Sequence, residues 1–158
     1  MQKEQIQEFT RKITQSNKSG LTVVTYEILF VYLADTTDAL KEKNWEAYKQ
    51  NIRQAQRCMN ELISTLNFSY ELSADLYRIY AYCRELLATA LYKRSEAELL
   101  ECEKLMKMLY VGFVEVAESD DSAPLMRNTE QVYAGYTYGR SDVNESKLGG
   151  ASNRGFFA

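Results

Sequence analysis

The side chains that could do chemistry in this chain are mostly carboxylates on segments with helical periodicity. Asp75, Glu85, Glu101 and Glu103 are of the type that holds a di-iron site inside a helical bundle. Such a site takes a Glu-x-x-His motif from each of two helices, and the sequence contains no histidine. Because these acids also lie mostly off the apolar stripes, we interpret them as solvated surface residues. The sequence therefore predicts neither a metal site nor a cofactor.

Nucleophilic catalysis has equally little support. A sequence without histidine lacks the commonest general base, and a reactive thiol needs a cationic or histidine neighbour. Cys58, Cys83 and Cys102 show no CxxC spacing, so we interpret them as small core residues in a reducing compartment. Neither Gly139-Arg140 nor Gly149-Gly150 has the spacing of a phosphate-binding loop. We predict that the protein is not an enzyme and has no catalytic residue.

Charge and hydropathy exclude two further classes of partner. The 158 residues carry a net charge of only −3, so no basic field indicates nucleic acid. No apolar run reaches the roughly 18 residues that a membrane span requires. The first residues, MQKEQIQEF, lack the apolar core of a secretion signal. We therefore expect a cytoplasmic protein that binds neither nucleic acid nor membrane.

The elements that must position any site are helices. Five amphipathic segments are predicted, at about 3–16, 21–41, 45–66, 71–93 and, with Ser95 as N-cap, up to about Glu118. In the four long segments apolar residues alternate at steps of three and four, the spacing of helices that pack side by side. Short links between them favour an all-α, antiparallel, up-down four-helix bundle. We expect an N-terminal cap helix in 1–18, the bundle in 19–119, and a partly flexible C-terminal tail in 120–158.

The shared phase of the stripes predicts which residues fill the core. They are Trp45, Ile52, Met59, Leu76, Ile79, Cys83, Met106, Leu109 and Phe113. The turn that separates the first two helices is predicted at Asn17–Gly20.

Apolar residues in excess of one core stripe are the strongest sign of a binding function. The first long helix has a second stripe, Leu21, Val24, Ile28 and Val31, and the last helix adds Leu100, Met108 and Val111 among others. A broad core stripe would explain any one of them. The whole set needs a cover, which could be the N-terminal segment, the tail, a second copy or a partner helix.

The N-terminal segment is predicted to be one such cover. Ile6, Phe9 and Ile13 form a narrow apolar face on a helix too short to be stable alone, so it must dock. The nearest apolar surface is the second stripe of the helix that follows, and we predict that the segment is a displaceable lid over it. In the tail, Val132, Tyr133, Tyr136 and Tyr138 are predicted to dock on the bundle or on a partner.

Several motifs resemble those of the flagellar export chaperone family FliS. Leu21–Glu27 is similar to its Leu-led apolar run, which ends in Tyr-Asp or Tyr-Asn, and Asn60–Asn67 follows at a matching distance. Leu72–Tyr82 is similar to a run with Leu-Tyr-x-Tyr, and Val132–Gly139 to a tail motif of clostridial members. The chain departs from the family at Ser19-Gly20, in place of Ser-Pro, and at Ile28, in place of Gly.

The resemblance implies an antiparallel bundle whose client is the disordered C-terminal segment of flagellin. In the family that segment becomes helical as it wraps the bundle, premature filament assembly is blocked, and the subunit stays ready for type III secretion. The flagellar export gate is a second implied partner. We predict client contacts at Leu21, Val24, Tyr26, Ile28, Val31, Tyr77 and Tyr80. The alternative is a structural bundle whose surplus stripes drive homo-oligomerisation, and both a monomer and a weak homodimer remain open.

Overall fold

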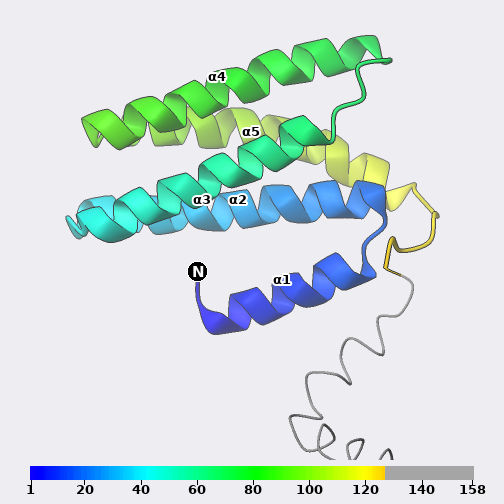
Figure 1. The fold of residues 1–158 in the computed structure, drawn as a ribbon, viewed down its shortest axis with the longest axis horizontal. Coiled ribbons are helices and arrows are strands. Elements are labelled where there is room, and N and C mark those ends of the chain that lie inside the picture. The colour runs from blue at the N-terminus through cyan, green and yellow to red at the C-terminus, as the bar shows by residue number, and fades with distance from the viewer. Residues whose placement is uncertain (127–158) are drawn as a thin grey trace, which may run out of the picture. The chain divides into compact units, whose positions relative to one another are not determined.

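The structure, a computed structural model, describes residues 1–126, which form five helices and no strand. The helices are α1 (Lys3–Gln15), α2 (Lys18–Lys41), α3 (Trp45–Ser64), α4 (Glu71–Lys93) and α5 (Glu96–Glu118) (Figure 1). Within this part of the chain no helix is both long and apolar enough to span a membrane. The predicted all-α class is confirmed.

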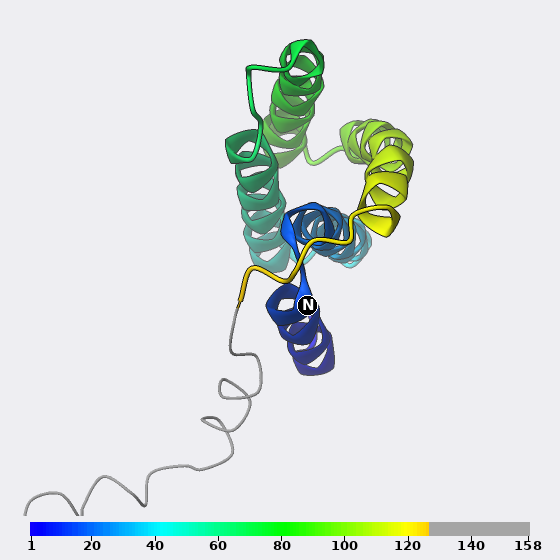
Figure 2. The same ribbon diagram turned by 90° about the vertical axis from the view of Figure 1, so that its right-hand side faces the viewer.

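The four long helices form the predicted antiparallel bundle. α2 packs against α3 and α5, and α4 packs against the same two helices, so the four close into a ring (Figures 1 and 2). The links between successive long helices are too short for anything but an antiparallel return. α1 lies outside this ring and packs against α2. α2 therefore has bundle neighbours on one side and α1 on another.

The first boundary of the bundle differs from the sequence prediction. α2 begins at Lys18, so the predicted turn at Asn17–Gly20 is wrong: most of it is the first turn of the helix. The side-chain oxygen of Asn17 accepts the Gly20 amide at 2.8 Å and acts as N-cap. A strong cap thus overrides the low helix propensity of glycine. At the other end of the next helix, α3 stops at Ser64, two residues short of the predicted boundary at 66.

Tight corners close the end of the bundle where α2 meets α3 and α4 meets α5. Lys43 and Arg94 both adopt left-handed backbone conformations, with φ values of 58° and 56°. Asn44 and Ser95 then cap the following helices, as predicted for Ser95. The Arg94 guanidinium lies over the Trp45 ring at 4.2 Å from its centroid, which joins the two corners.

Burial follows the predicted stripes closely. Ile52, Met59, Cys83 and Met106 are fully buried, and Leu76, Ile79, Leu109 and Phe113 are partly buried against that core. Trp45, also predicted for the core, lies outside it: the ring is partly buried at the corner and packs edge-on against Tyr48. All three cysteines are buried thiols, and burial raises the pKa of Cys58 to about 12.

Three tyrosines lie fully inside the bundle and have partners for their hydroxyls. The hydroxyls of Tyr26 and Tyr80 are 2.6 Å apart, which joins α2 to α4 across the ring. Tyr48 donates to the Ala90 carbonyl at 2.6 Å and joins α3 to α4. Burial raises the pKa of Tyr26 well above its usual value, so the hydroxyl stays neutral. These bonds remove the cost of burying a polar group.

Substitution of Tyr80 by Phe tests the importance of the Tyr26–Tyr80 bond. It would leave the Tyr26 hydroxyl buried without a partner, and should lower the free energy of unfolding by about 1–3 kcal/mol. The double variant Tyr26→Phe/Tyr80→Phe should be less destabilised than the sum of the single variants, because it strands neither hydroxyl. Urea unfolding measures both. Tyr92→Phe is the control, since that ring is 90% exposed. Fully additive single effects would contradict the prediction.

Candidate protein-binding surface

α1 lies antiparallel along one face of α2. Near its end, Lys12 forms an ion pair with Glu27 at 2.8 Å, and at its start the amino group of Met1 approaches the Asp35 carboxylate at 2.5 Å. The stretch of α2 between these two acids contains Ile28 and Val31. The structure therefore places α1 along this part of α2, and the role of α1 as a displaceable lid stays a prediction.

Phe9 is the one hydrophobic residue of α1 that the structure buries. Phe9 is 9% exposed and Val24 on α2 is 5% exposed, and within residues 1–126 both lie outside the main core cluster. Their burial away from the core reflects the packing of α1 on α2. Ile13 is half-buried, whereas Ile6 remains 52% exposed. Of the three predicted lid residues, the structure buries Phe9 alone.

The seven predicted contact residues divide into three groups. Leu21, Val24 and Val31 lie on α2 outside the core cluster, and Ile28 packs on its edge. Tyr26 and Tyr80 are 0% and 1% exposed, so their assignment to an accessible surface is corrected. The physical reason is their mutual hydrogen bond, which makes a buried tyrosine pair stable.

Tyr77 belongs to a different region from the α2 stripe. It is 41% exposed on α4, and its ring packs edge-on against Phe68 at 6.0 Å between centroids. Tyr70 and Leu72 are exposed beside them in the chain. α4 lies on the side of the bundle opposite α1 (Figure 1). The structure thus separates Tyr77 from the surface that α1 covers.

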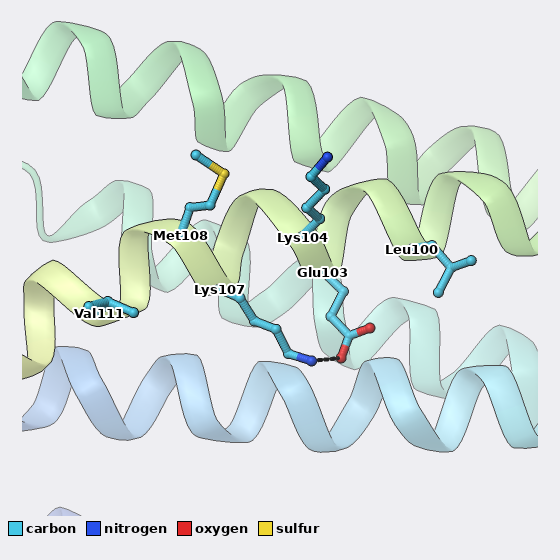
Figure 3. Close-up of a pocket in the computed structure, with 6 residues that line it drawn as sticks. All are labelled: Leu100, Glu103, Lys104, Lys107, Met108 and Val111. Carbon is cyan, nitrogen blue, oxygen red and sulfur yellow. Dashed lines mark ion pairs between the residues drawn. The ribbon is translucent and has the colours of Figure 1, made fainter.

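A second apolar surface lies on the outer face of α5. Leu100, Met108 and Val111, all more than half exposed, line a shallow hollow of about 480 Å³ together with charged residues (Figure 3). Lys107 is paired with Glu103 at 2.7 Å on the α2 side, while Lys104 and Met108 project on the α4 side. The apolar residues are spaced for contact with a helix laid along α5.

Comparison with known proteins identifies the family of this chain. The profile of the family described as flagellar protein FliS matches residues 1–120, which include all five helices. The chain belongs to the FliS family. No individual curated protein matches it significantly. FliS membership implies a non-enzymatic flagellin export chaperone, and so confirms the resemblance that was found in the sequence.

Polar contacts tie α1 to the bundle of this FliS member in a way that periodicity could not reveal. Glu27 accepts a hydrogen bond from the Tyr110 hydroxyl of α5 at 3.2 Å, on the carboxylate whose other oxygen faces Lys12 of α1. The hydrogen bond to Glu27 raises the pKa of Lys12, which remains charged. The partners are 15 and 83 residues from Glu27 in sequence. No local pattern in the sequence relates them.

The predicted tail contacts at Val132, Tyr133, Tyr136 and Tyr138 lie outside the described residues. The segment that precedes them is described as far as Met126. It runs from the end of α5 across the connection between α1 and α2 (Figure 2), where Leu125 donates its amide to the Ser16 carbonyl at 3.0 Å.

The attachment of α1 through Phe9 can be tested in the protein without a client. Burying a Phe side chain contributes about 1.5–3 kcal/mol, so Phe9→Ala should open α1 at least about tenfold more often. Trypsin should then cut after Arg11 and Lys12 correspondingly faster, as followed by mass spectrometry. Ile6→Ala, at a largely exposed position of the same helix, is the matched control. Equal cleavage rates in the two variants would contradict the prediction.

Proposed function

We propose that this protein binds the C-terminal segment of flagellin in the cytoplasm, blocks its premature polymerisation, and keeps it ready for flagellar type III secretion. Family membership supports flagellin as the client. Delivery to the export gate is the further step that the family resemblance implies.

The observation that carries the proposal is the weakly covered face of α2. Leu21, Val24 and Val31 recur at the spacing of helix-contacting residues and lie outside the core, so the bundle does not need them for its own packing. Their cover is α1, a helix of 13 residues with one buried aromatic ring. An isolated helix of this length is marginal in water. A client helix with more apolar anchors can replace it.

The outer face of α5 provides a second contact for the same client. Its apolar hollow is separated from the α1-covered face, so a segment that uses both must wrap around the bundle. A disordered segment suits this task, since it orders only as it binds and can cover a large surface. Clamping the C-terminal segment in this way makes it unavailable for contacts in a filament.

Competition with α1 sets the apparent affinity for the client. While α1 is docked, the α2 face is closed, and the observed affinity falls in proportion to the fraction of open molecules. The same cover reduces the exposed apolar surface of the free protein, and with it the tendency to aggregate. As a lid, α1 would thus cover the apolar α2 face before the client arrives and leave that face when the client binds.

Val31→Asp tests the α2 face directly. A carboxylate there should weaken binding of a flagellin C-terminal peptide at least about tenfold, because it would be buried without a partner under the client helix. Calorimetric titration measures the affinity, and circular dichroism checks that the helices persist. Gln50→Asp, on the exposed face of α3, is the control. The proposal fails if the unmodified protein shows no binding of the peptide in this titration. A complex mass of two copies without peptide would instead favour the structural bundle.

Deletion of residues 1–16 tests the lid. Without α1 the α2 face is permanently open, so the peptide should bind several-fold tighter or faster. The free protein should also aggregate at lower concentration, as light scattering would show. Weaker binding after the deletion would mean that α1 is part of the client-binding surface, and would exclude the lid role.

A further inference from the structure

The joint between α1 and α2 is held by the segment that follows α5. Two residues, Ser16 and Asn17, separate the helices. The Ser16 carbonyl accepts the Leu125 amide at 3.0 Å. The Asn17 side-chain amide donates to the carbonyls of Asp120 and Ser122 at 2.9 and 3.2 Å. Both residues of the joint are therefore bound by residues 120–125, which we call the strap.

The two polar atoms of the Asn17 side chain bind different parts of the structure. Its oxygen caps α2 by accepting the Gly20 amide, while its nitrogen binds the strap. A Cβ at position 20 would lie 3.1 Å from that oxygen, so glycine leaves room for the cap. Aspartate could keep the cap but has no N–H to donate. Asn17 is thus suited to join the helix start to the strap.

A second side chain strengthens the hold of the strap on the start of α2. The Ser19 hydroxyl donates to the Asp120 carboxylate at 2.5 Å, and the Ser122 amide donates to the other carboxylate oxygen at 3.0 Å. Hydrogen bonds from Ser122 and Ser19 lower the pKa of Asp120, which keeps it an acceptor near neutral pH. The strap is fixed at its start as well as at Leu125.

We propose that the strap controls the release of α1: swinging α1 away from α2 turns the backbone at Ser16 and Asn17, and so must break the bonds to residues 120–125. The Glu27 link from Lys12 to Tyr110 adds a second tie between α1 and the α5 side of the bundle. A ligand on α5 that draws the strap off the joint therefore opens the α2 face. This regulatory consequence rests on the proposed function, whereas the coupling of strap and α1 is a property of the protein alone.

Amide hydrogen exchange of the full chain without a client tests the coupling. Asn17→Asp keeps the cap but removes both donations to the strap, so the amides of α1 should exchange about tenfold faster while those of α3 stay unchanged. Ser19→Ala should have a smaller effect in the same direction. Asp121→Asn is the control, an exposed change within the strap. Unchanged α1 exchange in both variants, or equal acceleration in all helices, would overturn the proposal.

A binding experiment separates this proposal from the proposed function. If the strap controls α1, Asn17→Asp should raise the association rate of the flagellin C-terminal peptide several-fold over Asp121→Asn, as stopped-flow fluorescence would measure. An association rate equal to that of the control would contradict the control of release. If the peptide binds no variant, the proposed function fails, and the exchange result still decides whether the strap holds α1.

Discussion

The structure depends on the requirement that a tyrosine buried on α2 find a partner for its hydroxyl. Tyr26 meets Tyr80 of α4 across the bundle, and its ring packs against Phe113 and Tyr110 of α5, with centroid distances of 5.3 and 6.0 Å. One side chain therefore fixes α2 against two other helices. A buried hydroxyl without a partner is costly, so α2 has little freedom to rotate about its axis. That fixed rotation determines which residues of α2 face away from the core.

The face so presented joins stability and binding in one helix. Leu29 and Leu33 fill the core on one side of α2, while Val24 is buried on another side, where α1 packs. A single helix thus serves as a core element and, in the proposed function, as the surface for a client helix. The core holds α2 mainly through residues such as Leu29 and Leu33, so the proposed release of α1 would leave the bundle packed.

Sequence periodicity predicted the bundle well because each long helix repeats one apolar stripe, and stripes must face one another. It placed Ile52, Met59, Cys83 and Met106 correctly in the core. The assignment of Tyr26 and Tyr80 to the client surface was wrong. The residue type alone does not show whether a tyrosine hydroxyl is paired inside the bundle or faces a partner. Periodicity also missed the strap contacts of Asn17, since hydrogen bonds between residues 103 and 105 positions apart have no periodic signature.

The order of α1 before α2 in the chain has a consequence for protein synthesis. α2 is apolar on several faces and leaves the ribosome before the helices that cover its core side. The ribosome synthesises a chain from its N-terminus. Apolar surface that is exposed on an incomplete chain promotes aggregation. α1 is the one neighbour of α2 among residues 1–126 that is already complete at that stage. The segment that we propose as the lid of the α2 face is thus also available to shield the nascent helix.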